Sequence, residues 1–174
     1  LQNATGAIAL VRSIVGENLN VSAMLEALSN VTPAFGRGEQ LTIYGQPCEL
    51  VLVKNPAGFR LSLTSFDPTG YATMIAINDA YADGRDMSWL WDVDFDSLHR
   101  QGVATVSGIR AYDMALRLQY DEVPVDSVDI NISSALRRFI SRHASKPKRI
   151  YCSYTAMLKL RRLLASYTSV EEIR

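Results

Sequence analysis

The sequence predicts an α/β domain of three layers, in which a mostly parallel sheet is covered by helices on both faces. Short apolar segments that resemble strands alternate with longer segments of helical periodicity. The 174 residues suffice for one domain with a large core, or for one domain plus an appendage. An apolar content of 48% and a charged content of 21% are typical of a globular protein.

Two amphipathic helices are expected before the sheet. Residues 4–15 carry apolar side chains at helical spacing, and Gly16 is a suitable end for that helix. Asn20 can cap a second helix. This helical pair differs in character from the rest of the chain. We therefore expect residues 1–37 and residues 38–174 to be separate parts of the chain.

A β-hairpin is expected at the start of the second part. Its strands, residues 40–44 and 47–53, flank the short turn Gly45-Gln46, and Pro56 suits the first turn of a helix after it. The later predicted elements are, in order, a strand at 71–77, a strand at 102–107, a helix at 111–118, a short strand at 123–130, a helix at 133–143, a strand at 149–153 and a helix at 154–167.

Acidic side chains are concentrated directly after the predicted strand at residues 71–77. The stretch NDAYADGRDMSWLWDVDFD, residues 78–96, holds six aspartates and two tryptophans. Ligands and catalytic groups of parallel sheets gather beyond the carboxyl ends of the strands. Residues 54–58 and 107–110 follow other strands, so we expect all three segments to be neighbours in space. The acidic stretch therefore occupies a candidate functional edge.

Several interpretations of these aspartates are open from the residues alone. A calcium loop would begin at Asp92, but it lacks the glycine and the glutamate that its sixth and twelfth positions require. DVDFD resembles the DxDx(T/V) signature of haloacid-type phosphatases, except that Asp96 takes the Thr/Val place. The simplest interpretation is that the aspartates cap turns and helix starts while the tryptophans are core. It explains residues 83–86, two acids around an arginine, less well.

Another interpretation makes one aspartate the member of a catalytic triad that orients a histidine. The chain has only two histidines, His99 and His143, and neither is near a serine or cysteine in a known nucleophile motif. Both are expected at the surface. If Asp86 belongs to a triad, the nucleophile and the histidine must therefore come from another chain.

Charge and cysteine usage exclude several classes of function. Eighteen basic and eighteen acidic residues cancel, which argues against non-specific nucleic-acid binding. Cys48 and Cys152 lie in separate apolar segments without a CxxC pattern, so we expect reduced, buried cysteines and no metal site.

No apolar run approaches the ~20 residues that span a membrane. No signal peptide is recognisable, so a cytoplasmic location is expected.

Several motifs, in a fixed order, resemble one family. Residues 32–39, TPAFGRGE, resemble the junction that leads into the C-terminal domain of Mur ligases. The other motifs resemble the C-terminal domain of the Mur-ligase-like subunit (MurT type) of lipid II isoglutaminyl synthase. They are KNPAGF at 54–59, the stretch at 78–91, SGxRAxDMAxR at 107–117 and YTAML at 154–158. The resemblance implies a Rossmann-like Mur ligase C-terminal domain, with residues 1–37 as the last helices of the preceding central domain.

The resemblance also implies an activity. The family's complex amidates the D-glutamate α-carboxylate of the lipid II stem peptide during peptidoglycan synthesis, at the inner face of the membrane. The Mur-like subunit activates that carboxylate with ATP and Mg²⁺. A separate glutaminase subunit (GatD type), its partner in a heterodimer, releases ammonia from glutamine with a cysteine and a histidine. The Mur-like subunit supplies the aspartate of that triad. It is the second aspartate of the motif ADGxDxSW, which is Asp86 in this chain.

Other residues carry over from the family in the same way. Arg37 matches an arginine that Mur ligases turn towards the nucleotide phosphates. Lys54 and Asn55 match positions that line the cleft for ATP and the acceptor, although Asn55 is equally explained as a plain helix start. The contacts with the partner subunit are expected to involve Asp83, Arg85 and Trp89.

The chain lacks two features of the family's central domain. It contains no glycine-rich GxxxxGK[ST] loop and no zinc-binding cysteine insertion. We therefore expect a fragment that neither binds ATP strongly nor is active by itself. Two alternatives stay open. One is the C-terminal domain of an ordinary amino-acid-adding Mur ligase, which has no need of a triad aspartate. The other is a docking module without a catalytic role.

Overall fold

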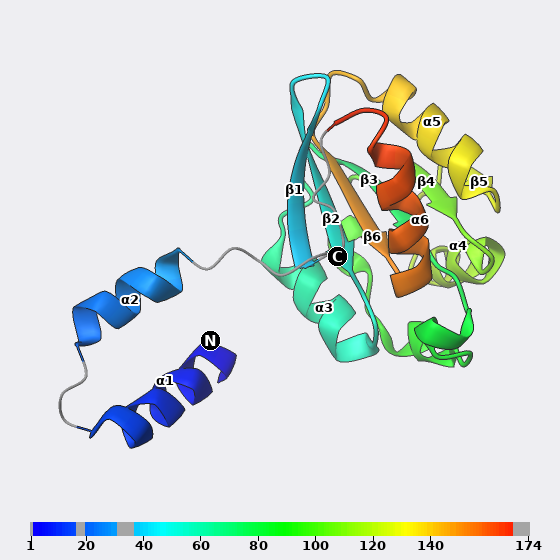
Figure 1. Cartoon of the computed structure of the whole chain (residues 1–174). Coiled ribbons are helices and arrows are strands. Elements are labelled where there is room, and N and C mark those ends of the chain that lie inside the picture. The colour runs from blue at the N-terminus through cyan, green and yellow to red at the C-terminus, as the bar shows by residue number, and fades with distance from the viewer. Residues whose placement is uncertain (1, 17–19, 31–36, 169–174) are drawn as a thin grey trace. The chain divides into compact units, whose positions relative to one another are not determined.

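The computed structural model describes residues 2–16, 20–30 and 37–168 (Figure 1). The chain divides into two compact units, Leu1–Pro33 and Ala34–Arg174. The first unit contains α1 (Gln2–Val15) and α2 (Val21–Ser29), and Asn20 caps α2 by accepting a hydrogen bond from the Ala23 amide at 3.0 Å. The two predicted helices are therefore present. Their assignment to a Mur ligase central domain stays a prediction.

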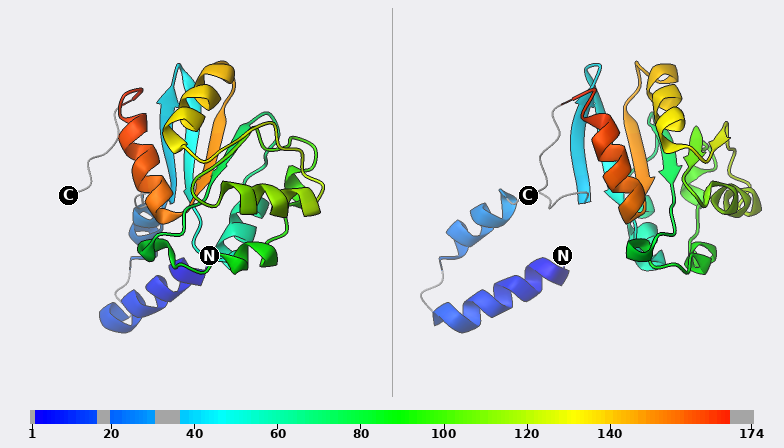
Figure 2. Two further views of the ribbon diagram at one scale, coloured as in Figure 1. Left: turned by 90° about the vertical axis from the view of Figure 1, so that its right-hand side faces the viewer. Right: turned by 45° about the vertical axis from the view of Figure 1, so that its right-hand side comes forward.

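The second unit is built on one sheet. Within the described residues the sheet has six strands in the order β1-β2-β6-β3-β4-β5 (Figures 1 and 2). β1 and β2 pair antiparallel as the expected hairpin, and all other pairs of strands are parallel. The strands are β1 (Arg37–Ile43), β2 (Gln46–Leu52), β3 (Ala72–Ala76), β4 (Thr105–Ser107), β5 (Val128–Asp129) and β6 (Lys148–Cys152).

Helices cover both faces of this sheet (Figure 2), which confirms the three-layer α/β class. Successive residues of a strand point to opposite faces. Met74 accordingly packs beneath α5 and α6, whereas Ile75 packs beneath α3, α4 and the segment at 87–98. The helices are α3 (Pro56–Ser65), α4 (Ala111–Tyr120), α5 (Ile132–Arg142) and α6 (Tyr154–Leu164), with short 3₁₀ helices η2 (Tyr81–Asp83), η3 (Ser88–Asp92) and η4 (Asp96–Leu98). None of the described helices is long and apolar enough to cross a bilayer.

Two strands are shorter than the sequence predicts. The strand expected at 102–107 is regular only over β4, and the strand expected at 123–130 only over β5. Gly102 has a φ of +67°, and a Cβ there would lie 2.9 Å from the Pro124 carbonyl oxygen. The two segments run parallel here, and Val103 and Val125 form an isolated bridge outside the regular strands. The regular ladder is limited to the pairs Val106–Val128 and Ser107–Asp129.

A buried ion pair explains the single acid in the apolar strand β2. Arg149 of β6 donates through Nε to Glu49 Oε2 at 2.6 Å and through Nη1 to the Asp67 carbonyl oxygen at 2.8 Å. Its guanidinium also lies 4.1 Å from the centroid of the Tyr71 ring. Removing one partner of such a pair would leave an uncompensated buried charge, which costs about 3–5 kcal/mol. Glu49 therefore serves the fold.

Gly108 permits the loops after β3 and β4 to approach each other. Its φ is +95°, and a Cβ there would lie 2.2 Å from the Ile77 carbonyl oxygen. Gly108→Ala should lower the free energy of unfolding by about 3 kcal/mol or more. The new alanine would have a strained φ, and the backbone at Ile77 would have to move away from its Cβ. Urea denaturation measures this change. Gly70→Ala is the control, since Gly70 has a φ of +81° but open space around it. It should cost only about 1–2 kcal/mol, and equal losses would contradict the steric explanation.

Candidate functional site

Asn78 joins the loops beyond the carboxyl ends of three strands. It follows β3 and is 8% exposed. Its backbone amide donates to Ser153 Oγ at 2.9 Å, and its side-chain Nδ2 donates to Thr155 Oγ1 at 3.1 Å. Its Oδ1 accepts a hydrogen bond from the Ile109 amide at 3.1 Å. The segment after β4 and the start of α6 therefore both contact the acidic stretch. The parallel sheet predicted the contact of the segment after β4.

Asp83 ties the acidic stretch to the N-terminus of α6. Its Oδ1 accepts a hydrogen bond from the Thr155 amide at 2.8 Å. Its Oδ2 accepts from Thr155 Oγ1 at 2.6 Å and from the Ala80 amide at 3.0 Å. The carboxylate thus satisfies an amide that the helix itself leaves unpaired, and it places negative charge at the positive end of the helix dipole. With both oxygens engaged, Asp83 is a poor candidate to orient an external histidine.

Asp86 is exposed, and hydrogen bonds engage its carboxylate only in part. Its Oδ1 accepts a hydrogen bond from the Ser88 amide at 2.8 Å, and among the described residues no donor bonds to its Oδ2. The backbone hydrogen bond from Ser88, helped by the Ser88 hydroxyl, lowers the pKa of Asp86. The side chain is therefore held in place, ionised at neutral pH and open to a donor from another protein.

A hollow of about 240 Å³ lies beside Asp86. Arg110 forms part of its wall, but other acids hold the charge of this arginine. Its Nε lies 2.9 Å from Asp79 Oδ2, without hydrogen-bond alignment, and its Nη1 donates to Asp113 Oδ2 at 3.1 Å. Arg85, which also lines the hollow, is exposed and forms no ion pair with Asp83, whose oxygens are occupied. The Asp86 carboxylate is thus not neutralised by an arginine of the described chain.

The two tryptophans of the acidic stretch differ in exposure. Trp89, the predicted partner contact, is partly buried and packs against the core beneath η3. Trp91 is 46% exposed and lines the hollow beside Asp86. The side chain that offers more surface to a partner is therefore Trp91, although a contact by Trp89 stays a prediction.

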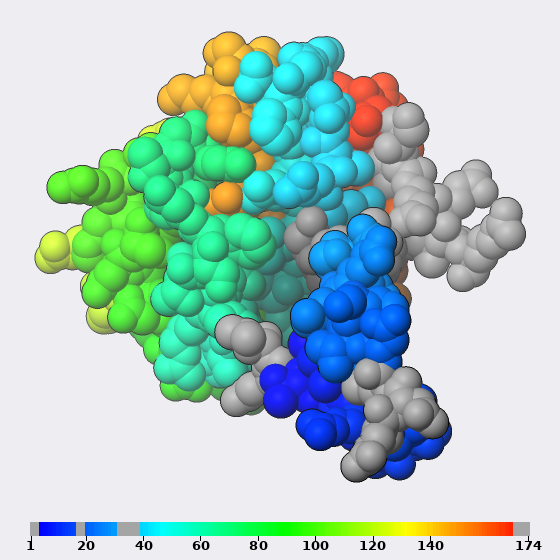
Figure 3. All heavy atoms as spheres, turned by 90° about the vertical axis from the view of Figure 1, so that its left-hand side faces the viewer, coloured from blue at the N-terminus to red at the C-terminus, as the bar shows by residue number. Residues whose placement is uncertain are grey.

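The predicted nucleotide residues lie at the start of α3. Asn55 caps α3 by accepting a hydrogen bond from the Gly58 amide at 2.8 Å, which explains this residue as a helix start. Lys54 is exposed, and its Nζ lies 5.4 Å from the centroid of the Tyr154 ring. Both border a hollow of about 440 Å³ between β2 and α3, which lie beside each other on the face shown in Figure 3.

The predicted junction at residues 32–39 lies partly outside the described residues. Residues 31–36 and the side chain of Arg37 lie outside the described residues. The backbone of Arg37 begins β1 and pairs with Val51. The assignment of Arg37 to the nucleotide phosphates therefore stays a prediction.

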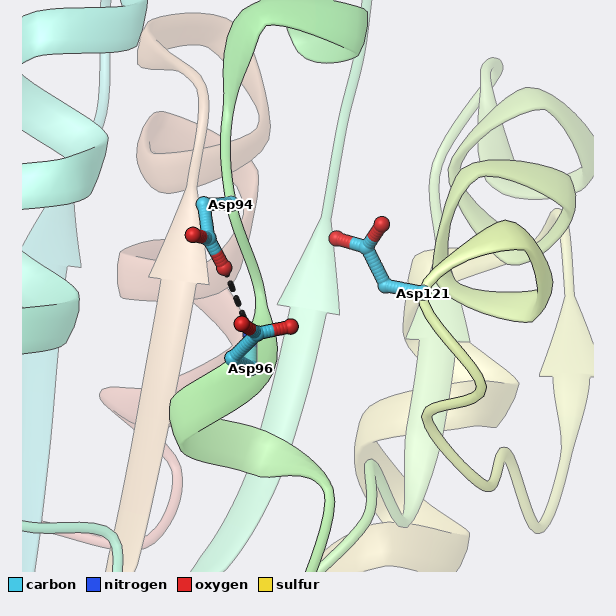
Figure 4. Close-up of side chains that lie close together, drawn as sticks. All are labelled: Asp94, Asp96 and Asp121. Atoms are coloured by element: carbon cyan, nitrogen blue, oxygen red, sulfur yellow. Dashed lines mark hydrogen bonds between the residues drawn. The ribbon is translucent and has the colours of Figure 1, made fainter.

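Three further acids lie close together. Asp94, Asp96 and Asp121 each offer a carboxylate oxygen within 4.8 Å of the others (Figure 4). Asp121 accepts from Arg117 Nη1 at 2.5 Å and from the Phe95 amide at 3.0 Å. Burial raises the pKa of Asp121, but these hydrogen bonds outweigh burial and the net pKa is lowered. Asp94 accepts from the Asp96 amide at 2.9 Å. These bonds explain the acids as turn-forming and ion-pairing groups.

The described residues contain no nucleophile poised beside Asp86. Cys48 and Cys152 are free and buried, as expected, and burial raises the pKa of Cys48 to about 12 and also raises that of Cys152. His99 is exposed, bonds to the Asp121 carbonyl oxygen and pairs with Asp96 at 3.4 Å. His143, at the end of α5, is only partly exposed, so its expected surface position holds in part. No hydrogen bond joins either histidine to Asp86.

Comparison with known proteins decides the family. Residues 52–157, more than half of the chain, match the family described as MurT ligase C-terminal. The chain belongs to this family. It is 30% identical over 172 residues to "Lipid II isoglutaminyl synthase (glutamine-hydrolyzing) subunit MurT" of Streptococcus pneumoniae, covering 95% of this chain and 38% of that protein. It is 33% identical over 127 residues to the protein of the same name from Staphylococcus aureus, covering 71% of this chain and 28% of that protein.

The fold agrees with this family. MurF from Acinetobacter baumannii superposes with a TM-score of 0.65 at 15% identity, covering 95% of this chain and 37% of that one. A pseudomurein peptide ligase type C from Methanothermus fervidus superposes with a TM-score of 0.61 at 13% identity, covering 94% and 34%. These likenesses show a Mur-ligase-like fold. The chain spans well under half the length of the curated relatives that it matches.

Thr155 is expected to matter for stability, because its amide and hydroxyl anchor the acidic stretch. Thr155→Val removes the hydroxyl that donates to Asp83 and accepts from Asn78. The free energy of unfolding, measured by urea denaturation, should fall by about 1–2 kcal/mol, since polar partners are left unsatisfied. Thr64→Val is the matched control, because the Thr64 hydroxyl bonds only within its own exposed helix turn. A loss for Thr155→Val no larger than the control's would refute the anchoring role.

The Asp86 carboxyl is expected to titrate below the ordinary aspartate pKa of about 3.9. Hydrogen bonds from Ser88 favour the ionised form, so the carboxylate persists as the pH falls through the usual range and is lost only in stronger acid. Ser88→Ala keeps the backbone donor and should raise the pKa only part of the way. Carbon-13 NMR of the side-chain carboxyl measures both values, and a native pKa at or above the ordinary one would count against this account.

Proposed function

We propose that the whole protein is the Mur-like subunit of an ATP-dependent, glutamine-hydrolysing ligase. It amidates the D-glutamate α-carboxylate of lipid II during peptidoglycan synthesis, and this chain docks the glutaminase subunit and completes its Cys-His-Asp triad. The observation that carries the proposal is the ionised, exposed Asp86 with a free Oδ2 and no histidine partner in the described chain. The curated relatives support it through their name, which specifies glutamine hydrolysis and a subunit.

Asp86 would act on the partner's histidine by hydrogen bonding. Its free Oδ2 accepts the N–H of one ring nitrogen, which fixes the tautomer in which the other nitrogen can take the proton of the nucleophilic cysteine. The carboxylate also stabilises the imidazolium that forms. The bond from the Ser88 amide to Oδ1 holds the side chain while Oδ2 makes this contact. Asp83 cannot replace it without giving up its bonds to Thr155.

ATP and Mg²⁺ belong to the whole protein in this proposal. ATP supplies the phosphoryl group that activates the carboxylate. The ammonium of Lys54, exposed beside the hollow at α3, suits an anionic phosphate, and the Asn55 amide nitrogen is free to donate while its oxygen caps α3. One lysine and one amide do not enclose a triphosphate. We therefore expect no strong binding of ATP by this chain alone.

The family resemblance also supports a location for the proposed reaction. Lipid II is a membrane-bound precursor, so the subunit would work in the cytoplasm at the inner face of the membrane. The remaining partners would be the glutaminase, as a heterodimer, and lipid II itself. The balanced charge of the chain gives no reason to add a nucleic acid to them.

Asp86→Asn should abolish the glutaminase activity of the complex while leaving the complex intact. The amide cannot stabilise an imidazolium and can stabilise the wrong tautomer, and the corresponding change in a Ser-His-Asp triad lowers kcat by about 10⁴-fold. We expect a loss of at least about 100-fold in glutamate release from glutamine, measured with the purified glutaminase and the whole Mur-like subunit. Gel filtration checks that the heterodimer forms.

Asp67→Asn is the matched control, since Asp67 is an exposed aspartate that also accepts a turn bond, from the Thr69 amide, but lies in the loop before β3, at the opposite end of the sheet from Asp86. It should leave glutamate release within about twofold of the native complex. If the Asp86→Asn complex forms and hydrolyses glutamine normally, Asp86 is not the triad aspartate. The chain would then be a docking module, or part of an ordinary Mur ligase if no glutaminase binds to the native protein.

A further inference from the structure

Exposed apolar side chains form a line along α4. Tyr112, Leu116 and Tyr120 follow one another at intervals of four residues, so they lie on one face of the helix. They are 70%, 47% and 71% exposed. The exposed Trp91 extends this line, because its ring meets that of Tyr120 edge-on with centroids 5.1 Å apart. We call these four residues the α4 stripe.

The α4 stripe is continuous with the surroundings of Asp86. Trp91 lines the hollow beside Asp86, and so does Asp113, the neighbour of Tyr112 on α4. Arg117, buried beneath the helix, lies 5.6 Å from the centroid of the Trp91 ring and holds Asp121. Figure 2 shows α4 and the segment of η3 on the same side of the sheet. An unbroken surface therefore runs from Asp86 to Tyr120.

Acidic groups border this apolar surface. Arg110 and Arg117, two arginines of the border, are each paired with an acid, whereas the third, Arg85, is exposed. The acids exceed them in number: Asp86, Asp92, Asp94, Asp96, Asp113, Asp121 and Glu122 are exposed or partly exposed. A complementary partner would have an apolar centre and a basic rim, because interface cores are apolar and aromatic while charges at the rim attract their opposites.

We propose that the α4 stripe is the centre of the surface that docks the glutaminase subunit. The inference rests on the proposed function, in which the partner's histidine touches Asp86. A stable interface covers about 800 Å² on each partner, a disc of about 16 Å radius. The nine residues from Tyr112 to Tyr120 span about 12 Å along the helix. A partner seated on Asp86 would reach the stripe through Trp91, which lines the same hollow, and the stripe would supply the aromatic side chains that dominate binding energy.

The test is the dissociation constant of the heterodimer, measured by isothermal titration calorimetry with the whole Mur-like subunit and the glutaminase. Leu116→Asp and Tyr120→Ala should each raise Kd about tenfold or more, since truncated or charged hot spots lose this much. Tyr44→Ala is the matched control. Tyr44 is a 65% exposed tyrosine at the turn of the hairpin, and its ring likewise meets another tyrosine. Its Kd should stay within about twofold of native. Circular dichroism checks that each variant folds.

The outcomes separate this inference from the proposed function. If the stripe variants bind the glutaminase as the native subunit does, the docking surface is wrong, whatever Asp86→Asn shows. If they instead lower the melting temperature of the subunit alone and leave Kd unchanged, another part of the same protein covers the stripe, and the inference is again overturned. If they weaken binding while the Asp86→Asn complex still hydrolyses glutamine, the docking surface stands and the triad role of Asp86 falls.

Discussion

The buried side chain of Asn78 is the constraint on which the functional edge depends. An amide has two donors and an acceptor to satisfy, and burial makes unsatisfied groups costly. The side chain of Asn78 donates one hydrogen bond to the start of α6 and accepts one from the loop after β4, while its backbone amide bonds to Ser153. The same contact needs Gly108, because any side chain there would strike the Ile77 carbonyl. Three loops that are far apart in sequence are thereby held in one arrangement before any ligand binds.

The aspartates of the acidic stretch differ in the partners that they have within the chain. Asp79 pairs with Arg110, Asp83 caps α6, and Asp94 forms a turn. Each has a partner within the described chain. Asp86 has a partner for one oxygen only, and that partner both orients the carboxylate and favours its ionised form. The simple interpretation of the aspartates as caps therefore fits most of them, including the turn that Asp86 forms with Ser88, and Asp86 is distinguished by its exposed place beside the hollow that Trp91 lines.

Much of the fold could be predicted from local patterns, because helical and strand periodicity, Asn20 and Pro56 act within a few residues. The shortness of β4 could not, since its pairing with β5 and the contact of Gly102 with Pro124 join segments that are distant in the sequence. The contact of Asp83 with Thr155 spans 72 residues, so no local pattern reveals that this acid is already engaged. Nor does the sequence indicate which tryptophan is exposed, because the irregular segment around η3 has no strict period. The parallel order of the strands, in contrast, correctly predicted that the acidic stretch meets the loop after β4.

The proposed triad requires a direct hydrogen bond between Asp86 and a histidine of the glutaminase. The pKa of that histidine, measured by NMR in the heterodimer with ¹⁵N-labelled glutaminase, tests this bond without relying on turnover. A carboxylate within hydrogen-bond reach favours the imidazolium and raises the pKa. We predict that the pKa falls by about one unit or more when the native subunit is exchanged for the Asp86→Asn variant. An identical pKa in the two heterodimers would contradict the account.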